Sequence, residues 1–159
     1  MNTSSELDRA VGERVTRIAP AREWVIGIPN QSIMLTTWDG FNAFCSRKRA
    51  QETLEENRLN FERAYGRKDG QWHEAEVWLN ETYPPYSSDL SWAWEVIEAL
   101  EGEGWNPHMA RNFNTHSWTV TFTKRIDGEL RERKGFGMDF RKAVCRAALA
   151  EPLPIGSRR

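Results

Sequence analysis

The chain has 159 residues, with 22 Lys and Arg residues against 23 Asp and Glu residues and a formal net charge of −1. This length is typical of one domain that buries a core without disulfides or metals. The balanced charge argues against a protein that overall charge holds to nucleic acid or to a membrane. No stretch reaches the roughly 18 apolar residues of a membrane span, and the N-terminus lacks a signal-peptide pattern, so we expect a cytosolic protein.

The first third of the chain predicts a helix followed by a hairpin. Apolar residues recur every three or four positions over residues 6–18, behind a cap region at residues 3–5 and before Pro20, which predicts an amphipathic helix. Two short apolar runs within residues 23–37 are divided by glycine and proline, so they predict a β-hairpin or a strand with a loop.

The next segment is predicted to be helical and then extended. Residues 39–66 form a mostly polar pattern, which indicates a long charged surface helix, broken near Ser46 and ended by Gly66. We expect a turn at residues 67–70, and the alternation over residues 71–79 predicts a strand.

A helix with signals at both ends follows Pro84 and Pro85. Ser87 or Ser88 can cap it, and Gly102 and Gly104 allow a left-handed exit. The predicted buried face is Leu90, Ala93, Trp94, Ile97 and Leu100. Trp92 falls off this face beside Glu95 and Glu98, which leaves two alternatives: the inserted region at residues 24–79 (see below) covers it, or it is exposed as an anchor for a protein partner.

The C-terminal third predicts strands and a final helix. Strands are expected at residues 105–111 and 117–124, and the pair Asp127-Gly128 predicts a hairpin turn into residues 130–136. A helix is then expected over residues 140–150, and the tail is expected to be loose. The order of elements predicts an α+β fold in which an antiparallel sheet is layered between helices. We expect one domain over residues 1–151 and a loose tail at 152–159.

Charge is unevenly distributed along the sequence. Residues 71–110 carry eight acidic side chains and no Lys or Arg, whereas residues 111–159 carry eleven basic and five acidic ones. This segregation predicts an acidic and a basic surface, which suits the steering of a partner or an anionic ligand and is also compatible with plain solvation.

The residues that could carry chemistry show no catalytic signature. Cys45 and Cys145 are expected to be buried free thiols. His73, His108 and His116 stand outside any metal-binding spacing, so neither a metal nor a cofactor is expected, and a Cys-His nucleophile pair has no local signature. We therefore expect a protein that is not an enzyme.

Two glycines before the last helix leave a ligand site open as an alternative. Gly135 and Gly137 suit a tight turn, and free N–H groups at a helix start also favour anions. Cations and aromatic rings in this region could hold a nucleotide phosphate and stack on its base. The candidate ligand-binding residues are Arg131, Arg133, Lys134, Arg141, Trp118 and Phe136.

Three segments together resemble a known family. Residues 7–15 (LDRAVGERV), 86–105 (YSSDLSWAWEVIEALEGEGW) and 144–149 (VCRAAL) are similar, in this order, to the phage alpha-beta-alpha sandwich domain found in bacteriophage and prophage proteins of unassigned role. The resemblance implies a three-layer fold and no reaction. Residues 24–79 are longer than the family implies, so we expect them to be an atypical inserted region.

Two functions follow as hypotheses. The first is an accessory protein in the host cytoplasm that acts by binding, as a counter-defence or host-takeover factor that occupies a host protein. Its candidate contact residues are Trp92, Glu95, Glu98, Arg58 and Tyr65. The second is a sponge that sequesters a nucleotide second messenger in the site named above. No membrane partner is expected, an enzyme and direct nucleic-acid binding rank lower, and a homo-oligomer stays open.

Overall fold

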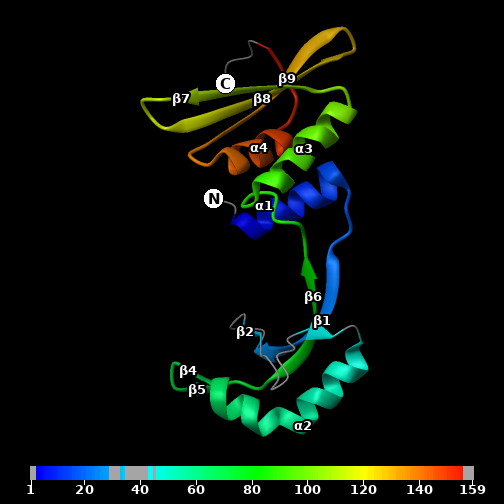
Figure 1. Cartoon of the computed structure of the whole chain (residues 1–159), viewed down its shortest axis with the longest axis vertical. Helices are drawn as coiled ribbons and strands as arrows, with labels where there is room; N and C mark the ends of the chain where they lie inside the picture. The colour runs from blue at the N-terminus through cyan, green and yellow to red at the C-terminus, as the bar shows by residue number, and fades with distance from the viewer. Residues whose placement is uncertain (1–2, 29–32, 35–42, 45, 156–159) are drawn as a thin grey trace. The chain divides into compact units, whose positions relative to one another are not determined.

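The computed structural model describes residues 3–28, 33–34, 43–44 and 46–155 (Figure 1). The chain divides into two compact units. Unit 1 comprises Met1–Pro20 and Tyr83–Arg159, and unit 2 comprises Ala21–Thr82. The sequence predicts one domain over residues 1–151 with an inserted region at 24–79, and unit 2 begins and ends within three residues of that region.

Unit 1 contains a four-stranded antiparallel sheet in the order β10-β9-β8-β7. The strands are β7 (Asn106–Asn112), β8 (Ser117–Ile126), β9 (Glu129–Gly137) and β10 (Leu153–Pro154). Asp127 and Gly128 join β8 to β9 with φ angles of 50° and 83°, the left-handed backbone of the predicted Asp-Gly turn. The tail was expected to be loose from residue 152, but Leu153–Pro154 instead pairs with Glu132 and Arg131 of β9. Residues 156–159 lie outside the described part of the chain.

The helices of unit 1 are α1 (Ser4–Val11), the π-helical turn η1 (Gly12–Thr16), α3 (Leu90–Gly102) and α4 (Phe140–Leu149). Figure 1 shows α3 and α4 on the same face of the sheet, with α1 beyond them. The contacts agree, since α4 packs on β8 and β9, α3 on β7, and α1 on α4. The prediction of an α+β fold with antiparallel strands and packed helices is confirmed.

The core of unit 1 forms where these helices meet the sheet. Val120 and Phe122 alternate with threonines on β8 and are fully buried, as the period of a strand requires. They pack with a cluster from the helices that includes Leu7, Val11, Ile97 and Val144. The opposite face of this sheet carries the threonines of β8.

Two helix boundaries differ from their predictions. The first helix was expected over residues 6–18, but its α-helical part ends at Val11 and η1 ends before Arg17, whose φ of 55° is left-handed. Thr3 caps its start in a capping box with Glu6. For α3 the cap is Asp89 rather than Ser87 or Ser88, because the Asp89 carboxylate accepts from the Ser91 and Trp92 N–H groups.

Unit 2 is built on the long strand β1 (Ala21–Ile28), which pairs along its length with β6 (Glu76–Thr82). On its other edge β1 pairs with β2 (Ile33–Met34) and β3 (Ala43–Phe44). The antiparallel β1–β2 pair confirms the predicted hairpin. Helix α2 (Arg47–Tyr65) packs on β1 and β6. The buried cluster of this unit is Ile26, Ala50, Leu54, Phe61 and Ala75.

The predicted long helix of unit 2 is shorter than expected. It begins after Ser46, whose hydroxyl accepts from the Arg49 N–H, while Phe44 belongs to β3. Residues 39–42 lie outside the described part. The predicted turn at 67–70 is a two-residue Asp69-Gly70 hairpin between β4 (Arg67–Lys68) and β5 (Gln71–Trp72). The predicted strand over 71–79 is thus split into β5 and β6.

Candidate functional site

Five side chains form a continuous surface on unit 1, which we call the Trp94–Phe113 surface. Its members are Trp94, Phe140, Trp118, Arg111 and Phe113. The Trp94 and Phe140 ring centroids lie 6.2 Å apart, and those of Phe140 and Trp118 lie 5.1 Å apart. The Arg111 guanidinium carbon lies 5.7 Å from the ring centroids of both Trp118 and Phe113. Each member therefore contacts the next.

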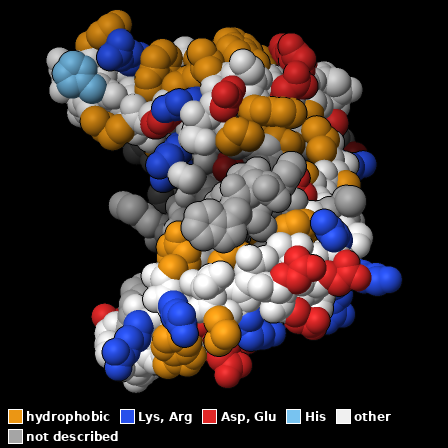
Figure 2. Space-filling model, turned by 60° about the horizontal axis from the view of Figure 1, so that its bottom comes forward, with side chains coloured by type: hydrophobic (Ala, Val, Ile, Leu, Met, Phe, Trp, Pro, Cys, Tyr) orange, Lys and Arg blue, Asp and Glu red, His pale blue; other side chains and the backbone are white. Residues whose placement is uncertain are grey.

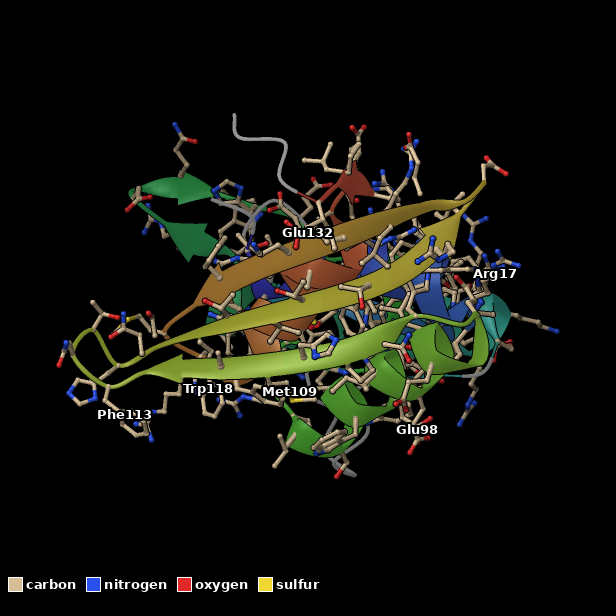
Figure 3. All side chains as sticks on the ribbon, turned by 90° about the horizontal axis from the view of Figure 1, so that it is seen from above. Arg17, Glu98, Met109, Phe113, Trp118 and Glu132 are labelled. Atoms are coloured by element: carbon tan, nitrogen blue, oxygen red, sulfur yellow. The ribbon has the colours of Figure 1, made fainter. Side chains whose placement is uncertain are left out.

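Four different elements position these side chains. Arg111 on β7 and Trp118 on β8 are register partners, so their side chains lie on the same face of the sheet. Phe140 is the first residue of α4, and Trp94 lies in the second turn of α3. Phe113 lies in the connection between β7 and β8, at the end of the hairpin in Figure 3.

The two ends of this surface are open to solvent. Trp94 is 45% exposed and Phe113 is 75% exposed, whereas Phe140 and Trp118 are half-buried. Leu90 and Met138 are among the other exposed apolar side chains of the same unit. Figure 2 shows hydrophobic side chains gathered on part of the molecular surface. Exposed apolar surface of this kind marks interaction sites, and Trp with Arg are the residues most enriched at binding hot spots.

Helix α3 adds acidic side chains next to Trp94. Glu95, Glu98 and Glu101 are exposed, and within the described residues none of them forms an ion pair. Figure 3 shows α3 running alongside β7, with Glu98 projecting to the solvent beyond that strand. The predicted concentration of acidic charge is thus present on this helix, and its carboxylates are free to attract cations.

Trp94 of α3 differs from its prediction, and the structure decides between the two alternatives left open for Trp92. Trp94 was expected on the buried face but is exposed, and Leu90 from the same predicted face is exposed as well. Trp92 is half-buried and packs on the core of unit 1, with its ring in an edge contact 5.8 Å from that of Tyr86. Val96 is buried instead. Trp92 is therefore covered from within unit 1, and Trp94 is the exposed anchor.

Two further residues were predicted as contacts with a protein partner. Arg58 and Tyr65 belong to α2 of unit 2. Arg58 donates to the Ala75 carbonyl at 3.2 Å and lies 3.6 Å from Glu62, while Tyr65 is half exposed. Acidic and basic side chains also pair on α2, as the contacts of Lys48 and Arg49 with Glu52 show.

The residues predicted to hold a nucleotide fall on two faces of the sheet. Gly135 of β9 faces α4, so Arg131 and Arg133 point to the helix side and Lys134 and Phe136 to the opposite side. Trp118 also lies on the helix side, against Phe140. The structure therefore does not bring the six predicted residues into one pocket.

Arg133 and Arg131 already contact other groups of the protein. The Arg133 guanidinium carbon lies 4.6 Å from the Trp105 ring centroid, and its Nη1 donates to the Ala148 carbonyl at the end of α4. Partial burial lowers the pKa of Arg133. Arg131 pairs with Glu129 at 3.2 Å. The Arg133 hydrogen bond thus connects β9 to the end of α4, whereas the Arg131 pair lies within β9.

The start of α4 is occupied by the protein's own carboxylate. Asp139 accepts from the Arg141 N–H at 2.9 Å and pairs with the Arg141 guanidinium. The hydrogen bond from the Arg141 side chain lowers the pKa of Asp139. Arg141 also donates to the Ser88 carbonyl at 2.6 Å. An anion at this helix terminus would meet the Asp139 carboxylate. Gly135 is instead explained by packing, because a Cβ atom there would collide with the backbone of α4.

The described cysteine is not a nucleophile in the folded protein. Cys145 is fully buried on α4, and burial raises its pKa to about 12, so it is a neutral thiol near pH 7. Cys45 lies outside the described residues. His108 lies on β7, opposite Thr121 of β8, and His116 lies in the β7–β8 connection. Within the described residues no three His, Cys, Asp or Glu side chains are grouped as metal ligands.

Sequence reasoning missed four members of the Trp94–Phe113 surface: Trp94, which was expected to be buried, and Arg111, Phe113 and Phe140. Phe113 carried a usable signal, because a large aromatic side chain stands within the polar turn sequence Asn-Phe-Asn-Thr. Arg111 and Phe140 meet only through Trp118, when β7 pairs with β8 and α4 packs on β8.

In the described part of the chain no helix is long and apolar enough to cross a membrane.

Comparison with known proteins identifies one family. No curated protein and no solved structure matches the chain significantly. The family model described as the phage ABA sandwich domain matches residues 33–149, a span that includes most of unit 2. Whether residues 24–79 are an insertion relative to other members stays a prediction. Since the match covers most of the chain, this protein belongs to the phage ABA sandwich domain family.

Proposed function

We propose that this phage protein is a non-enzymatic accessory factor that binds a host protein in the host cytoplasm, as a counter-defence or host-takeover factor. The observation that supports it best is the Trp94–Phe113 surface, where exposed aromatic rings are linked by an arginine and flanked by free carboxylates. A rigid aromatic cluster of this kind gives a partner large contact area at low entropic cost.

Two residues should contribute most of the binding free energy at this interface. Trp94 and Phe113 are the exposed ends of the surface, so each can enter a pocket of the partner, while Phe140 packs against Trp94 and Arg111 lies over Phe113. Truncation of a hot-spot tryptophan costs about 2 kcal/mol or more of binding free energy, which weakens affinity roughly thirtyfold.

Affinity capture from a lysate of the host bacterium tests the proposal. The full-length protein should retain a stoichiometric partner, and Trp94→Ser and Phe113→Ser should each lose it. Trp72→Ser is the matched control, because Trp72 is 53% exposed on the β4–β5 hairpin of unit 2. If no partner is retained, or if the Trp94 and Phe113 variants retain it as well as the control does, the proposal is wrong.

The alternative function, capture of a nucleotide second messenger, would use Arg131, Arg133, Lys134, Arg141, Trp118 and Phe136. It requires base stacking and phosphate contacts on one surface. Calorimetry of the protein with cyclic and linear nucleotides tests it, and absence of heat with all of them excludes it.

A further inference from the structure

The strand β7 is an edge of the unit 1 sheet, and one of its residues fixes which backbone groups face outward. In the strand order β10-β9-β8-β7, the only strand that pairs with β7 among the described residues is β8. Pro107 has no N–H group, so it fits at the outward-facing positions of an edge strand. Because N–H and C=O of one residue point the same way and alternate along an antiparallel strand, Met109 and Arg111 also face outward.

Helix α3 provides the floor beside this edge. Leu90, Trp94, Glu98 and Glu101 recur at spacings of four, four and three, so they lie on one stripe of the helix, and all four are exposed. The helix contacts β7 and runs alongside it (Figure 3). The short connection from Gly102 to Asn106 means that the glutamates lie toward Pro107 and Trp94 toward Arg111.

We propose that an extended segment of the partner protein adds to the sheet as a fifth strand along β7, with basic side chains directed to α3. This inference rests on the proposed function and specifies how the partner is recognised. Strand addition gives affinity through main-chain hydrogen bonds and specificity through alternate side chains. An apolar side chain of the segment contacts Met109 and Trp94, and a Lys or Arg side chain contacts Glu98 and Glu101.

Charge complementarity identifies the occupant. Helix α3 contains Glu95, Glu98 and Glu101 and no Lys or Arg. A partner segment that carries Lys or Arg is attracted to these carboxylates, which lie toward Pro107 beside the edge strand.

Hydrogen exchange of the free full-length protein tests the edge first. The Met109 and Arg111 amides should exchange rapidly, and those of His108 and Ala110 should be protected by their bonds to β8. The reverse pattern would overturn the inference, because the outward groups would then belong to the other residues.

Selection of random peptides of about ten residues on the full-length protein, followed by fluorescence anisotropy, tests the occupant. The selected peptides should alternate apolar and basic residues, and their affinity should fall as salt rises. Met109→Pro removes one outward N–H and should weaken binding about tenfold or more, since the proline ring also obstructs the incoming strand. The matched control Met109→Ala keeps the N–H and should bind within a few-fold of the parent.

The possible outcomes separate the two proposals. Peptides that bind equally to the Met109→Pro and Met109→Ala variants, acidic selected peptides, or no selected peptides would each overturn strand addition. A dimer in light scattering that Met109→Pro dissolves would identify a second copy as the occupant and also overturn it. If the host partner is still lost with Trp94→Ser and retained with Met109→Pro, the proposed function stands and strand addition is wrong.

Discussion

The carboxylate of Asp8 accepts a hydrogen bond from the backbone N–H of Ser87 at 2.7 Å, inside unit 1. Asp8 lies on α1 and Ser87 directly before α3, and both are buried. Two of the three segments that carry the family resemblance therefore meet at this bond. Next to it, the hydroxyls of Tyr86 and Thr16 lie 2.7 Å apart, and burial raises the pKa of Tyr86. The family motif thus serves the fold.

Loss of the Asp8 carboxylate should destabilise unit 1. Asp8→Ala leaves the Ser87 N–H buried without an acceptor, which costs about 1–3 kcal/mol, while Asp8→Asn keeps an acceptor and should cost less. Urea unfolding followed by circular dichroism measures both. Glu101→Ala, at an exposed position of α3, is the control and should stay near the parent. Equal stability of Asp8→Ala and the control would contradict this role.

Gly135 should tolerate no side chain. A Cβ atom there would collide with the Ala143 carbonyl oxygen and the Ala147 nitrogen, which are backbone atoms of α4. Gly135→Ala should therefore cost about 3 kcal/mol or more, because β9 and α4 must move apart. At Gly102 a Cβ meets nothing within 4 Å, so Gly102→Ala should be neutral or slightly stabilising. Thermal unfolding of both variants checks the contrast, and similar midpoints would contradict it.

Stability should fall at alkaline pH through Cys145. The pKa of the thiol is about 8.5 in an unfolded chain, and burial raises it to about 12 in the folded protein. Between these values the unfolded state has lost a proton that the folded state retains, so the free energy of unfolding decreases by up to about 1.4 kcal/mol per pH unit.

Urea unfolding of the parent and of Cys145→Ala at several pH values checks this, because the difference between the two should shrink from about pH 8.5 upward. Taking the difference removes the contribution of Tyr86, whose pKa is raised as well. Parallel pH profiles would show that Cys145 titrates normally. Iodoacetamide followed by peptide mass spectrometry should also leave Cys145 unlabelled at neutral pH until the protein is unfolded.

The two tryptophans of α3 should separate stability from binding. Trp92→Ala removes a ring that packs on Tyr86 and should cost about 2 kcal/mol or more, while Trp94→Ala should change stability by less than about 1 kcal/mol. Chemical unfolding compares them directly. A larger loss for Trp94 than for Trp92 would contradict the assignment of Trp94 as the exposed anchor.

Local signals predicted most elements of this chain. The Asp127-Gly128 turn requires left-handed backbone at both residues, and the alternation of Val120 and Phe122 with threonines fixes the buried face of β8. Prediction was weaker at boundaries, where side-chain caps decide. Asp89 rather than Ser87 caps α3 because Ser87 is drawn into the core by Asp8. Periodicity predicted that Trp94 is buried. The period of a helix shows which residues share its apolar face, but not which part of that face other elements leave exposed to solvent.

By itself the sequence determined the family, the α+β class and the acidic character of α3, because these depend on residue order and local periodicity. The tertiary structure decided what lies at the surface. It divided the predicted nucleotide-binding residues between two faces of the sheet, and it joined Trp94, Phe140, Trp118, Arg111 and Phe113 from four parts of the chain. The physical reason is that solvent exposure depends on which elements pack together, and contacts between distant segments leave no periodic signal in the sequence.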